Sequence, residues 1–93
     1  MSAIIVSRTH QYSIEELKNK IDKIILDIQQ ELEFQSEWET ESNLVFRRKG
    51  ANGSIDIDEN NFELTLRLGM MFRALKGTIE RQIIKVVDSH LNV

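Results

Sequence analysis

The stretch FELTLRLGMMFRALKGTIERQIIKVV, residues 62–87, changes its hydrophobic period partway along. Its first seven residues alternate apolar and polar side chains, which is the pattern of a strand with one buried face. From Leu75 onward the apolar residues recur at spacings of three and four, which is typical of an amphipathic helix. The stretch therefore predicts a strand over 62–68 and a last helix that begins near Ala74 and fades after His90.

The same alternation extends backwards from this strand over three further segments. With the exception of Ser36, apolar or aromatic residues occupy every second position in 34–39, 44–47 and 55–58, and short polar turns separate these segments. Residues 50–53, Gly-Ala-Asn-Gly, are expected to form one of the turns, because Asn-Gly favours the positive φ angles of tight hairpins. Four antiparallel strands that share one apolar face are therefore predicted.

A helix and an opening strand complete the predicted order. Residues 3–8 are rich in β-branched side chains, and Ser13 with Glu16 has the capping-box pattern at the start of a helix over 13–32. The apolar stripe of this helix consists of Ile14, Leu17, Ile21, Ile24, Ile28 and Leu32. The predicted fold is α+β in the order β-α-β-β-β-β-α, with one antiparallel sheet and both helices packed on one of its faces.

Length and composition bound the class of protein. A chain of 93 residues with no proline, repeat or low-complexity stretch predicts a single domain over 1–93. Its content of 41% hydrophobic and 29% charged residues is that of an ordinary globular protein. The absence of cysteine excludes a disulfide framework, a thiolate metal site and a cysteine nucleophile. No apolar run has the length of a signal peptide or a membrane span, so a cytoplasmic protein is expected.

The charge distribution argues against nucleic acid as a partner. The net charge is −3, with nine acidic and four basic residues in 1–46 and six acidic and eight basic residues in 47–93. Nucleic-acid-binding domains are usually clearly basic, so no nucleic-acid partner is expected. Trp38 and Phe46 could serve as stacking platforms for bases, but both fall on the apolar alternation and are expected to pack in the core.

Catalytic motifs are not found in the sequence. The two histidines, His10 and His90, lie outside the spacings of known metal sites, and the sequence has neither a nucleophile elbow nor a P-loop. His10 is expected to bond the turn beside the end of the first strand, and His90 to lie at a helix C-terminus, where the dipole favours it. Asp56 and Asp58 are expected on a solvated strand face. The expectation is a protein without enzymatic activity, cofactor or metal.

A basic run precedes the predicted glycine-rich turn. Arg47, Arg48 and Lys49 are candidates for contact with an anion, since cations beside a glycine-rich turn suit phosphate. A second interpretation is that these charges lie at a hairpin tip and prevent pairing with other sheets. The sequence leaves both interpretations open.

The joint between the last strand and the last helix is unusually apolar. Such joints usually run over the surface and are polar. The candidate interaction patch consists of Met70, Met71, Phe72, Arg73, Leu75 and Lys76. Three interpretations compete: a plug over the end of the core, a contact in a homodimer, and a surface for an apolar partner, to which methionine adapts well. They depend on whether Met71 and Phe72 face the core or solvent.

An ordered set of motifs, strongest over residues 45–91, resembles a known family. An aromatic residue leads into Arg-x-Gly-x-x-Gly, and the elements Phe-x-Leu, Leu-Gly and Lys-x-x-Ile-Glu follow in order. They fall on Phe46, Arg48, Gly50, Gly53, Phe62, Leu64, Leu68, Gly69, Lys76, Ile79 and Glu80, and His10 matches upstream. The set resembles the putative polyhydroxyalkanoic acid system proteins, a family associated with polyester storage granules in bacteria.

The resemblance implies a cytoplasmic protein linked to polyhydroxyalkanoate storage or its regulation, with a granule or granule proteins as its partner. It implies no catalytic residues. The expected architecture also looks like a small version of the helix-grip folds, which bind lipids and other ligands. An alternative is therefore an acyl-ligand cavity between the sheet and the last helix, lined by Phe46, Leu64, Leu66, Ile79 and Ile83. A homo-oligomeric interaction module, for instance a homodimer, is a further possibility.

Overall fold

The computed structural model describes residues 2–91, and their elements follow the predicted order. The elements are β1 (Ser2–Thr9), α1 (Ile14–Leu32), β2 (Gln35–Thr40), β3 (Asn43–Arg48), β4 (Ala51–Ile57), β5 (Asn61–Leu68), a 3-10 helix η1 (Met70–Leu75) and α2 (Lys76–Leu91). The predicted α+β class and the predicted order of helices and strands along the chain are confirmed, and η1 is an element that the sequence pattern did not predict.

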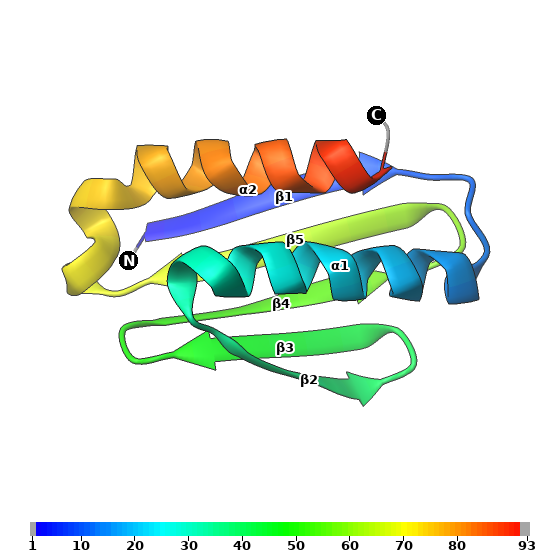
Figure 1. Cartoon of the computed structure of the whole chain (residues 1–93), viewed down its shortest axis with the longest axis horizontal. Helices are drawn as coiled ribbons and strands as arrows, with labels where there is room; N and C mark the ends of the chain where they lie inside the picture. The colour runs from blue at the N-terminus through cyan, green and yellow to red at the C-terminus, as the bar shows by residue number, and fades with distance from the viewer. Residues whose placement is uncertain (1, 92–93) are drawn as a thin grey trace.

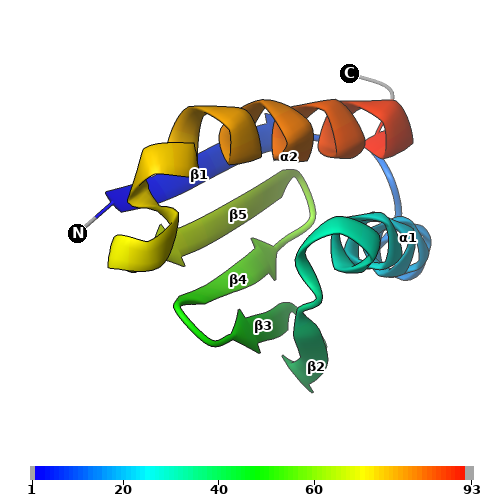
Figure 2. The same ribbon diagram turned by 60° about the vertical axis from the view of Figure 1, so that its left-hand side comes forward.

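The five strands form one antiparallel sheet in the order β1-β5-β4-β3-β2 (Figure 1). Strands β2 to β5 are joined as consecutive hairpins, whereas β1 precedes α1 in the chain and pairs with β5 at the far edge. This pairing runs without a shift from Ser2 opposite Leu68 to Thr9 opposite Asn61. Both helices lie on the same face of the sheet, and the opposite face is left open (Figures 1 and 2).

Alternation along the strands places the core between the sheet and the two helices. The burial pattern of β5 alternates strictly from Asn61 to Leu68 except for a half-buried Thr65, as expected for a strand with one covered face. The largest fully buried side chains come from the sheet and from both helices: Ile4, Leu17, Ile21, Ile24, Leu44, Phe46, Ile55, Phe62, Leu64, Leu66, Ile83 and Leu91. The predicted apolar face is thus the face that the helices cover.

Helix α1 begins and ends with specific backbone bonds. The Ser13 side chain accepts from the Glu16 backbone N–H at 3.1 Å, and a Glu16 carboxylate oxygen accepts from the Ser13 N–H at 3.4 Å, so the predicted capping box is confirmed. At the other end Glu33 adopts the left-handed conformation with φ 52°, and its N–H donates to the Gln29 carbonyl. This conformation stops the helix and turns the chain into β2.

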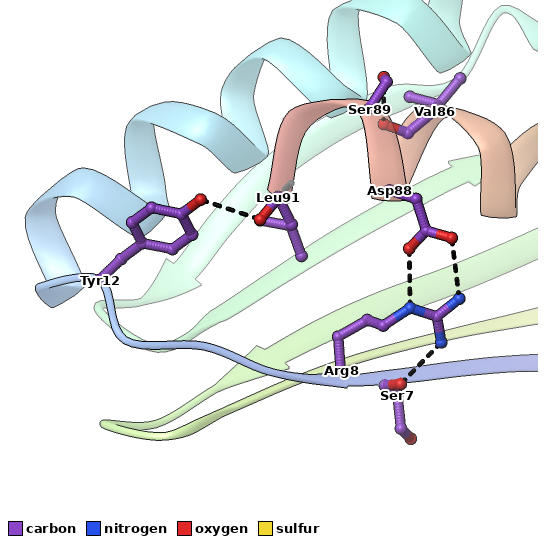
Figure 3. A network of polar contacts seen from close by, with 7 residues as sticks. All are labelled: Ser7, Arg8, Tyr12, Val86, Asp88, Ser89 and Leu91. Carbon is purple, nitrogen blue, oxygen red and sulfur yellow. Dashed lines mark hydrogen bonds and ion pairs between the residues drawn. The ribbon is translucent and has the colours of Figure 1, made fainter. Parts of the chain in front are cut away.

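Polar bonds fasten the C-terminal half of α2 to the N-terminal part of the chain (Figure 3). Arg8 donates from Nε to Asp88 Oδ1 at 2.8 Å and from Nη2 to Asp88 Oδ2 at 3.3 Å. The hydrogen bond to this carboxylate raises the pKa of the Arg8 guanidinium. Tyr12, in the loop between β1 and α1, donates its hydroxyl to the Leu91 carbonyl at 2.9 Å. These bonds connect α2 to the edge strand β1, which it overlies in Figure 1.

The β3–β4 turn differs from the prediction. The turn residues are Lys49 and Gly50, and Gly50 supplies the positive φ of 87°. Asn52 and Gly53 lie within β4, paired with Arg47 and Phe46, so the prediction of a turn over 50–53 is wrong. Gly53 serves packing instead: a Cβ at this position would lie 2.5 Å from Phe46 Cζ and 2.6 Å from the Thr65 carbonyl oxygen.

The β4–β5 turn is stabilised by Asp58 and His10. One Asp58 carboxylate oxygen accepts from the backbone N–H of Asn60 at 2.8 Å and of Asn61 at 2.7 Å, and these bonds lower the pKa of Asp58. The His10 ring bonds the Asp58 carbonyl through Nε2 at 2.8 Å and accepts from the Tyr12 N–H through Nδ1 at 3.1 Å. His10 therefore bonds the turn beside the end of β1, as predicted.

We expect Gly53→Ala and Gly77→Ala to change stability in opposite directions. The methyl group at residue 53 overlaps the Phe46 ring and a backbone oxygen, so we expect a loss of about 1–3 kcal/mol. Nothing lies within 4 Å of a Cβ at Gly77, which is in α2, so alanine there should add about 0.4–1 kcal/mol. Urea denaturation measures both changes, and a neutral Gly53→Ala would contradict the packing described for Phe46.

We expect the stabilising effect of Asp58 to depend on pH. Because the folded state lowers the pKa of Asp58, its contribution is complete above the ordinary aspartate pKa of about 3.9 and is lost as the pH falls through the folded value. Asp58→Asn keeps an accepting oxygen but does not titrate. The stability difference between wild type and this variant should therefore shrink between pH 7 and pH 3 in urea denaturation. A constant difference would contradict the assignment.

Candidate functional site

Segment η1 connects the end of β5 to α2 and is drawn in yellow at the left of Figure 1. The last helix was predicted to begin near Ala74, but α2 begins at Lys76, and residues 70–75 form a 3-10 helix instead. The Gly69 N–H donates to the Gly50 carbonyl at 2.8 Å, and this bond holds the chain against the β3–β4 turn as it leaves the sheet.

Phe72 is the residue of η1 that faces inward. Its half-buried ring packs against the core cluster and covers Gly50, where a Cβ would lie 3.2 Å from Phe72 Cε2. The guanidinium carbon of Arg48 lies 4.8 Å from the centre of the same ring, within the range of a cation–π contact. Phe72 therefore closes the end of the core beside the β3–β4 turn.

The other large apolar residues of η1 face solvent. Met70 is 87% exposed, Met71 63% and Leu75 50%. Leu75 was predicted to lie on the apolar stripe of the last helix; it lies outside this stripe because it precedes α2. Of the large apolar residues in the joint, Phe72 thus faces inward and the other three face outward. The interpretation of the joint as a plug over the end of the core therefore applies to Phe72 alone.

Arg48 connects three elements at this end of the molecule. Its Nη1 donates to the Leu32 carbonyl, the last residue of α1, at 2.6 Å, while its guanidinium lies over the ring of Phe72 in η1. Its Nε is buried and has no hydrogen-bond partner among the described residues. Arg48 therefore holds η1 and the C-terminus of α1 against β3, a role that the sequence pattern did not reveal.

The three residues of the predicted anion contact border one hollow, but their side chains point in different directions. Arg47 and Arg48 are neighbours in β3, so their side chains point to opposite faces of the sheet. Arg47 is exposed and lies 4.0 Å from Glu39, and Lys49 is exposed in the turn. All three border a hollow of about 540 Å³ at the sheet rim, together with Gln35 and the acidic Glu33. An anion contact there remains a prediction, with Arg48 already bound elsewhere.

The remaining polar candidates have partners within the protein. The His90 ring lies 2.6 Å from Asp27 of α1, and the His90 carbonyl accepts from Lys20 at 3.2 Å. His90 thus lies in the last turn of α2, as predicted. Asp56 accepts from the Asn43 side chain at 2.6 Å on the open face. Within residues 2–91, no group of three or more His, Cys, Asp or Glu side chains is placed to hold a metal ion.

Aromatic side chains lie on the helix-covered face, as predicted. Phe46 is fully buried and contacts Phe34 edge to face, with ring centres 4.9 Å apart. Trp38 is half-buried, donates from its indole nitrogen to Asp22 of α1 at 3.0 Å, and has the ammonium group of Lys18 over its ring. Phe46 is therefore a core residue, and Trp38 packs against α1 at the edge of the core.

The side chains proposed to line an acyl-ligand cavity are packed together in the core. They are all at least 97% buried: Phe46, Leu64, Leu66, Ile79 and Ile83. A hollow of about 500 Å³ lies over the open face of the sheet, where Arg47, Asn52, Ser54 and Arg67 border it. The core positions thus lend the cavity interpretation no support.

Comparison with known proteins identifies one matching family model. The model of the putative polyhydroxyalkanoic acid system proteins matches residues 4–91. No curated protein matches the chain. Within the part of the chain that the structure describes, neither helix is long and apolar enough to cross a membrane.

We expect Arg48→Met to loosen η1 and to destabilise the protein by about 1–3 kcal/mol. The variant keeps the apolar stem but loses the bond to the Leu32 carbonyl and the contact of the guanidinium with Phe72. Urea denaturation gives the stability, and hydrogen exchange at the Gly69 and Phe72 amides reports on η1. Arg47→Met, on the exposed face of the same strand, is the matched control and should change stability by less than about 0.5 kcal/mol.

Proposed function

Because this chain belongs to the family of putative polyhydroxyalkanoic acid system proteins, we propose that it binds the surface of polyester granules without catalysing a reaction. The contact is made by the η1 patch, defined as Met70, Met71, Arg73, Leu75 and Lys76. The proposed place of action is the granule surface in the cytoplasm, where the bound protein takes part in storage of the polymer or its regulation.

The observation that carries this proposal is the outward apolar surface of η1. Met70, Met71 and Leu75 expose large apolar side chains within six consecutive residues, whereas the other exposed large hydrophobic residues of the described chain, Ile5 and Leu26, lie on separate elements. Clustered exposed apolar area marks interaction surfaces more often than scattered single residues do. Methionine suits an irregular polymer surface, because its flexible, polarizable thioether adapts to different shapes.

The charged members of the patch fit the polar chemistry of a polyester. A polyhydroxyalkanoate chain carries ester oxygens, which accept hydrogen bonds, and has no donors between its ends. Arg73 and Lys76 supply donors beside the methionines, and the first turns of η1 and α2 contain no acidic residue. Long cationic side chains also cover apolar surface with their stems while the charged ends stay hydrated. The patch therefore offers apolar contact and matching donors together.

The way in which η1 is held supports its use as a binding surface. Phe72 and Arg48 fix the segment to the core, and the Gly69–Gly50 bond fixes its start, so the exposed side chains project from an anchored backbone. An anchored surface loses less conformational entropy on binding than a flexible loop does. The inward Phe72 belongs to the anchor and is not part of the contact.

We expect Met70→Ser with Met71→Ser to weaken granule binding by at least about tenfold. Burying one methionine side chain contributes about 1.5–3 kcal/mol, and about 1.4 kcal/mol corresponds to a factor of ten in affinity. Co-sedimentation with purified polyhydroxyalkanoate granules over a range of protein concentrations measures the effect. Both residues are exposed, so the thermal unfolding transition should stay cooperative and close to that of wild type.

The matched control for this experiment is Ile5→Thr. Ile5 is 61% exposed, close to the 63% of Met71, but it lies in β1, on the open face of the sheet. This variant should bind granules like wild type. Equal binding by the folded double-methionine variant would overturn the assignment of the patch, and equal losses in both variants would point to non-specific adsorption.

A further inference from the structure

Strand β1 presents an edge with few protective features. It occupies one end of the sheet, and its outer side pairs with no other strand among the described residues. The segment 3–7, Ala-Ile-Ile-Val-Ser, contains no charge and no proline, and the register with β5 is unbroken over the whole of β1. Proteins usually protect such edges, because a straight, uncharged edge strand pairs readily with another strand.

The opposite edge of the sheet has these protective features. Strand β2 carries Glu37 and Glu39, and its pairing with β3 shifts between Trp38 and Thr40. Carboxylates and an irregular register both discourage pairing with a further strand. The contrast within one sheet indicates that β2 is built to remain an edge, whereas β1 is suited to a partner.

Two hydrogen bonds show which backbone groups of β1 point outward. The His10 N–H donates to the Asn60 carbonyl, on the side of β5. The Ser7 carbonyl, three residues earlier, accepts from the Arg8 side chain at 2.8 Å (Figure 3). Backbone groups of successive residues alternate between the two sides of a strand. The N–H and C=O groups of Ala3, Ile5 and Ser7 therefore face away from β5.

We propose that β1 pairs antiparallel with β1 of a second copy of this chain, across a two-fold axis at Ile5. In this register the two Ile5 residues face each other, and Ala3 of each copy lies opposite Ser7 of the other. All the outward-facing pairs are small or apolar, and no like charges meet. The pairing also places the exposed Ile5 side chains, each 61% exposed alone, in contact on the open face.

One contact within the protomer must yield when the dimer forms. Arg8 releases the Ser7 carbonyl, which then accepts from Ala3 of the other copy. Arg8 keeps its two bonds to Asp88, so its guanidinium stays paired. The number of hydrogen bonds therefore does not fall, and the outward groups of Ala3 and Ile5 gain partners. The dimer does not depend on the proposed function of the η1 patch.

Sedimentation velocity and amide hydrogen exchange on the full chain test this proposal together. The wild type should sediment as a dimer of twice 10.8 kDa, and the Ala3, Ile5 and Ser7 amides should be protected as well as those of Ile4 and Val6. A monomer at millimolar concentration would overturn the proposal. So would a dimer in which the three outward amides exchange freely, because its interface would lie elsewhere.

A pair of variants at one position separates the backbone contact from the side chain. Ile5→Pro removes an outward N–H without removing a bond to β5, since proline is tolerated on edge strands, and should yield a folded monomer. Ile5→Thr keeps the N–H and should remain a dimer. A folded Ile5→Pro variant that still dimerises would overturn the proposal. If Ile5→Pro does not fold, the exchange of the wild-type amides decides.

Discussion

The single apolar face of the sheet is the constraint on which the rest of the structure depends. Alternation along β3, β4 and β5 directs the buried side chains of these strands to one side, so both helices must lie there. The helices are fastened at opposite edges: α1 by the bond from Trp38 to Asp22 near β2, and α2 by the pair of Arg8 and Asp88 near β1. Residues 2–91 contain no further α-helix to cover the other face, which is left open.

The way in which Phe72 closes the end of this core explains why the η1 patch, to which we assign binding, is exposed. The layer between sheet and helices is open where β5 leads into α2, and Phe72 covers it with support from Arg48 and Gly50. A tight 3-10 turn that directs Phe72 inward leaves Met70 and Met71 directed outward. The same turn therefore fixes both the inward position of Phe72 and the outward position of the two methionines. Because the methionines are not part of the core, their side chains can change during evolution without disturbing it.

Much of the fold follows from local pattern, whereas the details of the candidate site do not. Period and capping residues predicted the order of helices and strands along the chain, the start of α1 and the places of His10 and His90, because these signals lie within a few residues of one another. The turn at Lys49–Gly50 was predicted at the wrong residues, because Asn52-Gly53 is locally a strong turn signal. Glycine is needed at position 53 for another reason: the ring of Phe46, in the neighbouring strand, leaves no room for a side chain there. The link from Arg48 to Leu32 likewise joins positions far apart in the chain, so no local pattern signals it.

The pairing of β1 with β5 has a consequence for the order in which the molecule assembles. Strands β2 to β5 can close as successive hairpins, each spanning a short loop, whereas β1 must wait for residues 61–68. During synthesis, Ile4 and Val6 therefore stay exposed until most of the chain has been made. A fragment that ends before β5 has no neighbour for its first strand, so we expect it to be a target for chaperones and not a stable intermediate.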